Sequence, residues 1–434
     1  MADLIHKIEA ELARTWRGGG LGVAVSGGGD SVALMHIAAA WADRRGVPLE
    51  VATVDHGLRS ESAAEAAGVA IAAAELKLRH TTLRWDNWDG RGNLQAEARN
   101  ARRRLLADWA RGRGLKAVLL GHTMDDQAET VLMRLGRGAG VDGLSGMLPA
   151  VDRDGLRWLR PMLGVRRTEL RGWLQEQSIG WVDDPSNEDE RFERVKARKA
   201  LDAVAPLGIS AEGLAETASR LQDAREGLDY AAAELASEAA EWGLCGELRL
   251  RLTPLRAAPR ELTRRILRAG LTGASGAEYG PRAGAEQKLI SAMFGLKLGG
   301  GRSLHGCLIR PDGPDRVVIV REAAAVTAQR APLSQQPVLW DGRFRLAASA
   351  PQDGADIAPL GEVGARRLTK LAEDGAWTAP DRWSLAPRGA RLTTPALWRG
   401  EALVAAPLAS YGDALTAEFA KADPSWVDPS PETA

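Results

Sequence analysis

The first 205 residues alternate between short apolar runs and longer amphipathic stretches. Runs at 21–25, 49–54, 80–85 and 116–120 are typical of strands, and the segments between them have the length and spacing of helices. This alternation predicts a doubly wound α/β domain around a mainly parallel sheet. Ligands of such sheets bind beyond the carboxyl ends of the strands, so the turns after the strands are the first places to search for chemistry.

The pattern changes near Ala205 and Pro206, where long alanine-rich helical stretches begin. A chain of 434 residues is too long for one hydrophobic core, so two or three domains are expected. We predict a catalytic domain over residues 1–205, a mainly helical substrate-binding domain over 206–325 and a small α+β domain over 335–420. Within the second domain, residues 302–320 are expected to form a hairpin.

Composition narrows the class of protein by what it excludes. Lys plus Arg equals Asp plus Glu at 57 each, so any nucleic-acid surface must be local. Two cysteines, Cys245 and Cys307, are too few for a disulfide framework or a Cys-rich zinc site. The first 17 residues predict an amphipathic helix rather than a signal peptide, and no apolar run reaches membrane-spanning length. We therefore expect a cytoplasmic protein with no membrane partner.

A polar loop, Ser26 to Ser31, lies between the first predicted strand and the following helix. Its glycines let backbone amides approach a ligand, and the free N–H groups at the helix start attract anions. Asp30 is out of place beside phosphates unless a cation lies between them, so we interpret it as a Mg²⁺ ligand. The loop resembles the Ser-Gly-Gly-x-Asp-Ser pyrophosphate loop of the N-type ATP pyrophosphatases, which implies ATP cleavage between the α and β phosphates. The alternative is a glycine-rich turn without a ligand.

A second candidate cluster follows the strand at 116–120. His122, Asp126 and Glu129 fall on one side of a predicted helix start, by the i, i+4, i+7 rule. A buried histidine that caps the helix is the structural alternative. Two acids beside a histidine at the carboxyl end of a strand favour a functional site.

A third cluster lies on the predicted helix from residue 93 to 112. Arg99 and Arg102 are three residues apart and can reach a common anion, with Glu97 expected near both. A solvated charged face is the alternative, and most charge runs are of that kind.

Taken together, these segments resemble the bacterial tRNA(Ile)-lysidine synthetase family across nearly the whole chain. The segments that carry the resemblance are Ser26–Ser31, Val54–Arg59, Asn93–Arg102, Gly121–Thr130, Asp184–Asn187, Thr394–Trp398 and Ala405–Leu408. The sequence departs from the family's pattern after Asp184–Asn187. The family has an Arg-Asn-Arg-x-Arg run there, whereas this chain has Arg194 to Arg198 with Val195 at the asparagine position.

The resemblance implies that lysine, ATP and the wobble cytidine of a CAU-anticodon tRNA(Ile) give lysidine, AMP and pyrophosphate. It implies ATP and Mg²⁺ as cofactors and tRNA and L-lysine as partners, is compatible with a homodimer, and gives both later domains a role in holding tRNA. The candidate catalytic residues are Asp30, Arg99, Arg102, His122 and Asp126. The candidate nucleotide-binding residues are Ser26, Gly27, Gly28, Gly29, Asp30, Ser31 and Asp55, with Asp30 as the metal ligand. The candidate substrate-binding residues are Glu97, His122, Asp126 and Glu129.

The RNA partner needs a positive surface, and three runs supply one. Residues 91–113 hold seven basic and two acidic side chains, and residues 157–171 and 191–199 hold five and one each. Charges aimed at phosphates give salt-dependent affinity. For a single arginine, a GC-rich coding bias is the better explanation, but it does not account for the clusters.

Two alternative functions stay open at this stage. Another PP-loop tRNA-modifying enzyme, such as a thiolase, would need cysteines near the ATP site, and none precedes Cys245. A non-catalytic ATP-binding protein would keep the loop but release no pyrophosphate.

Overall fold

The computed structural model describes residues 2–57, 62–85, 94–153, 155–182, 193–295, 297–333, 336–349 and 354–420. By their internal contacts these residues divide into two compact units, Met1–Arg225 and Glu226–Thr433, and the division falls inside one long helix, α9 (Ala211–Ala239). The boundaries expected near residues 205 and 330 stay predictions. None of the described helices combines the length and apolar character that a membrane crossing requires.

The first unit is built on one six-stranded sheet with the strand order β3-β2-β1-β4-β6-β5. Its strands are β1 (Leu21–Ala24), β2 (Leu49–Asp55), β3 (Arg79–Arg84), β4 (Ala117–Leu120), β5 (Ala150–Arg153) and β6 (Leu156–Leu159). Its helices are α1 (Ala2–Thr15), α2 (Gly29–Arg45), α3 (Ser62–Glu75), α4 (Leu94–Gly112), α5 (Met124–Gly136), α6 (Val141–Leu144), α7 (Arg167–Glu176), α8 (Glu193–Val204) and the start of α9. All neighbouring strands are parallel except the edge pair β5–β6, which confirms the doubly wound, mainly parallel prediction.

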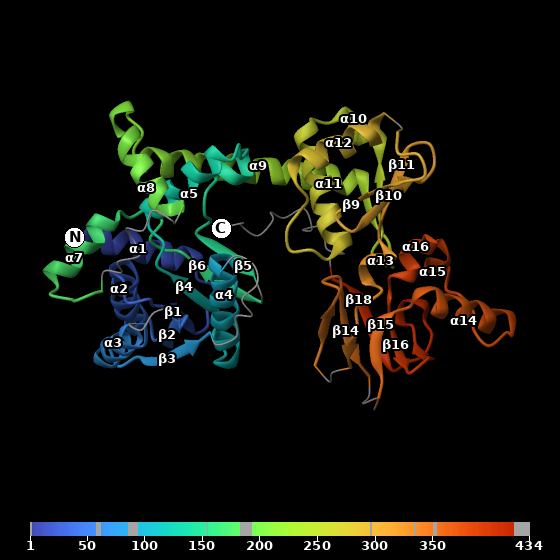
Figure 1. The fold of residues 1–434 in the computed structure, drawn as a ribbon, viewed down its shortest axis with the longest axis horizontal. Coiled ribbons are helices and arrows are strands. Elements are labelled where there is room, and N and C mark those ends of the chain that lie inside the picture. The colour runs from blue at the N-terminus through green and yellow to red at the C-terminus, as the bar shows by residue number, and fades with distance from the viewer. Residues whose placement is uncertain are drawn as a thin grey trace. The chain divides into compact units, whose positions relative to one another are not determined.

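Helices cover both faces of this sheet (Figure 1). Leu21 and Val23 of β1 lie in the larger core, with side chains of α1 and α2. On the other face α4 packs its Trp109 directly over β1, and a Cβ atom at Gly22 would lie 2.6 Å from that ring. Glycine at position 22 therefore allows α4 to approach the sheet closely.

The direction of winding reverses between β1 and β4, which lie side by side in parallel. This is the switch point at which α/β sheets bind ligands beyond the strand ends. The segments that leave the carboxyl ends of β1, β2 and β4 carry the Ser26 loop, Asp55 and His122. The fold therefore places three of the predicted turns at one edge of the sheet.

The second unit contains three antiparallel sheets of five, four and three strands. The strands are β7 (Ala240–Trp242), β8 (Leu248–Arg251), β9 (Arg302–Leu304), β10 (Cys307–Pro311), β11 (Arg316–Arg321), β12 (Ala331–Pro332), β13 (Val338–Trp340), β14 (Phe344–Ala348), β15 (Asp356–Pro359), β16 (Pro395–Arg399), β17 (Ala402–Ala405) and β18 (Leu415–Phe419). The helices are the rest of α9, α10 (Leu252–Ala257), α11 (Arg260–Ser275), α12 (Ala283–Phe294), α13 (Ala323–Val326), α14 (Gly361–Glu373), α15 (Asp381–Leu385) and α16 (Arg388–Leu392).

Two hydrophobic cores meet at β11 in this unit. Val317 and Ile319 lie in the core with α11 and α12, whereas Val318 and Val320 lie in the core of the C-terminal sheets. Alternate residues of a strand face opposite sides, so one strand can serve both cores. The hairpin expected over 302–320 is present as β10–β11. The long alanine-rich helix α9 ends at Ala239, and the chain continues directly as β7.

Candidate active site

The loop after β1 is held in place by the two serines that begin and end it. The Ser26 N–H donates to Ser31 Oγ at 3.1 Å, and Ser31 Oγ donates to the Gly28 carbonyl at 2.9 Å. Gly27 has a φ of +90°, which a side chain would strain. The loop is therefore preformed, and the first N–H groups of α2 stay available for an anion.

The start of α5 presents the second predicted cluster. Thr123 caps the helix in a reciprocal arrangement with Asp126: the Thr123 N–H and Oγ1 donate to Asp126 Oδ2 at 2.8 and 2.9 Å. The turn before it lies close to the phosphate loop, since a Cβ atom at Gly121 would be 3.1 Å from the Cα atom of Ser31. The α5 carboxylates are thus fixed beside the start of α2.

One guanidinium joins the two clusters. Arg167, the first residue of α7, donates from Nε to Asp30 Oδ2 at 2.8 Å and from Nη2 to Asp126 Oδ1 at 3.1 Å. Its Nη1 lies 3.9 Å from Glu129 Oε1. Arg198 of α8 pairs with the same Glu129 oxygen at 3.0 Å, and Arg194 lies 3.9 Å from Asp126 Oδ1. Three carboxylates and three guanidinium groups therefore form one network.

The pKa values of the three carboxyl groups shift in different directions within this network. Burial raises the pKa of Asp30, although Arg167 opposes the shift. Burial and the nearby charge of Asp126 raise the pKa of Glu129. Burial also disfavours the charged form of Asp126, but the nearby His122, the positive charges of Arg167 and Arg194 and the hydrogen bond from the Thr123 N–H outweigh it and lower the pKa of that carboxyl. Asp126 is therefore the firmest anion of the three.

A cluster of arginines surrounds His122. Burial and the charge of Arg160 lower the pKa of His122 well below its usual value, so the imidazole is neutral at pH 7. Its buried Nδ1 has no hydrogen-bond partner among the described residues. Part of the Arg99 side chain reaches solvent, yet burial of its guanidinium and the charges of Arg194 and Arg102 lower its pKa to about 10. Burial and Arg194 also lower the pKa of Arg102. Such a concentration of positive charge suits a phosphate-rich ligand.

The remaining predicted residues lie outside this charge network or outside the described residues. Asp55, at the end of β2, accepts from the Gly57 N–H at 2.9 Å and from Ser62 Oγ at 2.7 Å, and these bonds lower its pKa. No ion pair joins Glu97 to Arg99 or Arg102 within the described part of α4. The predicted segment Asp184–Asn187 and Arg59 lie outside the described residues. The roles assigned to all candidate residues stay predictions.

Magnesium fits the oxygen donors at this site. No group of three or more His, Cys, Asp or Glu side chains in the described part of the chain could hold a metal ion by itself. Mg²⁺ commonly binds through one or two carboxylates together with substrate phosphates. Asp30 and Asp126 are close enough to share one guanidinium, and Asp30 Oδ1 is buried without a hydrogen-bond partner among the described residues.

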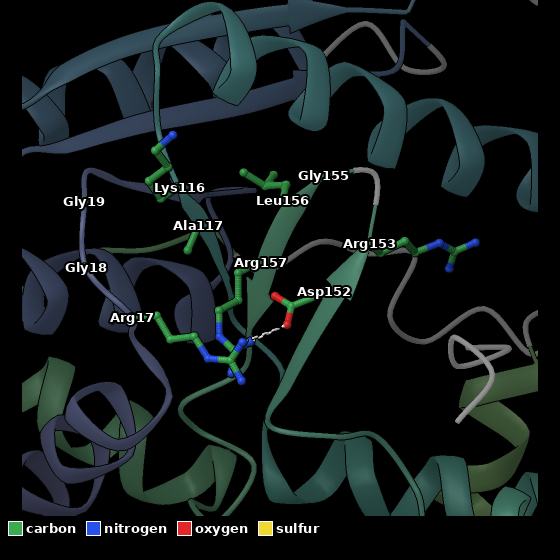
Figure 2. Close-up of a pocket in the computed structure, with 10 residues that line it drawn as sticks. All are labelled: Arg17, Gly18, Gly19, Lys116, Ala117, Asp152, Arg153, Gly155, Leu156 and Arg157. Atoms are coloured by element: carbon green, nitrogen blue, oxygen red, sulfur yellow. Dashed lines mark hydrogen bonds and ion pairs between the residues drawn. The ribbon is translucent and has the colours of Figure 1, made fainter. Parts of the chain in front are cut away.

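A separate cavity of about 640 Å³ lies at the amino-terminal ends of the strands, opposite the predicted nucleotide site (Figure 2). It is lined by residues that precede β1, β4 and β6, including Gly18, Lys116 and Gly155. Arg17 and Arg157 both contact Asp152 Oδ2 there, at 3.3 and 2.6 Å. Because it adjoins the amino ends of the strands, this cavity is not the predicted nucleotide site.

The parallel sheet and its serine- and glycine-rich loop define a PP-loop protein of the ATP pyrophosphatase class. A family model described as the PP-loop domain matches residues 4–204. The chain belongs to the tRNA(Ile)-lysidine synthase family: it is 46% identical to the Ruegeria pomeroyi protein of that name, over 92% of this chain and 91% of that protein. The protein of the same name from Wolbachia pipientis wMel is 33% identical, over 78% and 79% of the two chains.

Solved structures are more distant. The U34-tRNA thiolase NcsA from Methanococcus maripaludis, solved with its [4Fe-4S] cluster, is 14% identical to this chain with a TM-score of 0.45. The match covers 51% of this chain and 78% of that one.

Replacing Thr123 by valine tests the cap that fixes Asp126. Thr123 is fully buried, so valine fits its volume but removes the hydroxyl. We expect the free energy of unfolding to fall by about 1–2 kcal/mol, the usual cost of losing such a cap. Chemical denaturation would measure it, with Thr369→Val as the control because that exposed hydroxyl only back-bonds to the Ala365 carbonyl. Equal losses in the two variants would contradict the capping role.

Proposed function

We propose that this protein is an ATP-dependent ligase that joins lysine to C2 of the wobble cytidine in tRNA(Ile) with a CAU anticodon. The products are lysidine, AMP and pyrophosphate. The observation that carries the proposal is the pairing of a phosphate-binding loop with the acids Asp126 and Glu129, bridged by Arg167. Relatives named tRNA(Ile)-lysidine synthase over most of their length support it.

The first half of the reaction activates the base. The C2 oxygen of cytosine attacks the α-phosphorus of ATP, an O–P bond forms, and the bond to pyrophosphate breaks. The loop amides and α2 start would hold the departing pyrophosphate. Asp30 would hold Mg²⁺, which when bound neutralises phosphate charge. Arg99 and Arg102 would face charge on the α-phosphate or the C2 oxygen.

The second half replaces the adenylate with lysine. The ε-amine attacks C2, a C–N bond forms, and the C2–O bond breaks as AMP leaves. The amine must lose a proton to attack, and we assign to the neutral imidazole of His122 the role of orienting the base or of taking that proton. Asp126 and Glu129 are the acids we assign to the lysine ammonium, and Asp55 is assigned to the adenosine. Glu97 is kept as a candidate substrate contact.

A thiolation reaction is the nearest competing function. It requires nucleophilic cysteines, whereas Cys245 and Cys307 both lie buried in the second unit. Burial raises the pKa of both thiols, that of Cys307 to about 12, so neither is a thiolate at neutral pH. These properties favour ligation over sulfur transfer. The homodimer and the cytoplasmic location stay predictions.

The test is an assay with purified protein, radiolabelled lysine, ATP, Mg²⁺ and an unmodified tRNA(Ile) transcript with the CAU anticodon. We expect labelled tRNA and equimolar AMP only when all components are present. A transcript with uridine in place of the wobble cytidine is the matched control and should accept no lysine. ATP binding without tRNA-dependent AMP would instead support the non-catalytic alternative.

A further inference from the structure

Arg167 is held at the active site by an anchor of its own. The backbone N–H of Arg167 donates to Asp125 Oδ2 at 2.7 Å, and the neighbouring Arg166 side chain donates to Asp125 Oδ1 at 3.2 Å. Asp125 belongs to α5, so the first turn of α7 is fixed to α5. A cation at a helix N-terminus is disfavoured by the helix dipole, so its contacts with carboxylates must offset that cost.

The six charged side chains of the network around Arg167 balance one another before any ligand arrives. Asp30, Asp126 and Glu129 supply three negative charges, and Arg167, Arg194 and Arg198 supply three positive ones. A lysine ammonium that approached these acids would add a positive charge and compete with a guanidinium already seated there. Lysine binding at these acids is therefore favoured when one of the three arginines moves away.

Arg167 is the arginine that a nucleotide would draw away. It is the one of the three whose guanidinium touches the phosphate loop, through Asp30. Guanidinium forks bind phosphate as readily as carboxylate, and a triphosphate on the loop offers more negative charge than Asp30 does. Asp30 Oδ1 and Glu129 Oε2 are buried with no hydrogen-bond partner among the described residues, so both acids keep acceptor capacity for an incoming ligand.

We propose that Arg167 couples nucleotide binding to lysine binding, by exchanging the carboxylates of Asp126 and Glu129 for the phosphates of ATP. Bound nucleotide thereby frees the two acids for the lysine ammonium. Arg167 is a positioning residue in this scheme, and the scheme rests on the proposed function because it takes lysine as the second ligand. Its consequence is an order of binding, with ATP before lysine.

The experiment measures the lysine Kd by isothermal titration calorimetry, with and without Mg²⁺ and α,β-methylene ATP, which cannot be cleaved at the α–β bond. For the unaltered protein we expect the analogue to tighten lysine binding by about tenfold or more, within the usual range of coupling between sites. For Arg167→Gln we expect tighter lysine binding without nucleotide and a change of less than about twofold on adding the analogue. Arg220→Gln, at an exposed arginine paired with Glu216, should behave as the unaltered protein.

A further variant keeps the outcomes separate. Arg167→Lys keeps the charge but lacks the planar guanidinium fork, so an intermediate coupling is expected even if the glutamine variant does not fold. An unaltered protein that binds lysine equally well with and without the analogue, or an Arg167→Gln variant with full coupling, would overturn the inference and leave the proposed function standing. Absence of lysine binding in every state would instead count against the proposed function.

Discussion

Asp30→Ala is expected to lower tRNA-dependent AMP formation by about a thousandfold, while tRNA binding is retained. The reason is electrostatic, because the variant loses the carboxylate that we assign to Mg²⁺ beside the phosphate loop, and such groups contribute about 10²–10³ in rate. Burial raises the pKa of Asp30, so its charged form opposes folding at neutral pH and its removal should not lower the melting temperature. Single-turnover AMP release and filter binding of tRNA measure the two effects.

Asp43→Ala is the matched control for this prediction. Asp43 lies on the same helix, α2, but is exposed and far along it from the phosphate loop. It should keep full activity and full tRNA binding. If Asp30→Ala released AMP at the unaltered rate, the metal role would be wrong; if it lost tRNA binding as well, the loss of activity could not be assigned to the phosphate loop.

The parts of the site that follow strands could be predicted because strand order alone brings them together. Ser26, His122 and Asp126 each lie just beyond or near a strand end, and parallel strands carry their carboxyl ends to one edge. Arg167 could not be found this way. It is 137 residues from Asp30 in the chain and begins an ordinary-looking basic helix. A pair of arginines at a helix start, where the dipole disfavours cations, was the available signal.

The elements of the fold could likewise be predicted where nearby residues specify them, and could not where distant residues do. Periodicity predicted the strands β1 to β4 of the parallel sheet, since these strands are bounded by turns that the sequence itself marks. The antiparallel edge β5–β6 and the short strand β7 were not predicted, because short strands depend on neighbours for their pairing. The burial of Arg343 could not be predicted either, because nothing in the local sequence indicates that an arginine will be completely buried.

That buried arginine belongs to a charge network in the second unit. Asp341 accepts from Arg343 Nε at 2.6 Å and from both Arg321 Nη2 and Gln329 Nε2, at 2.9 and 2.8 Å. Arg343 also donates to the Thr393 carbonyl at 2.7 Å, which ties the turn after β13 to the segment before β16. Burial lowers the pKa of Arg343, although Asp341 opposes the shift. Asp341 is therefore the carboxylate on which two poorly solvated guanidinium groups depend.

We expect Asp341→Asn to destabilise the second unit by about 3–5 kcal/mol, the usual cost of removing one partner from a buried ion pair. Asparagine tolerates the φ of +50° at this position, so charge rather than backbone strain is tested. Hydrogen exchange at β14 and β18 measures the effect within that unit, and Asp374→Asn, at an exposed helix end, is the control. Unchanged exchange in the Asp341 variant would contradict this prediction, and the network would then position these strands without stabilising them.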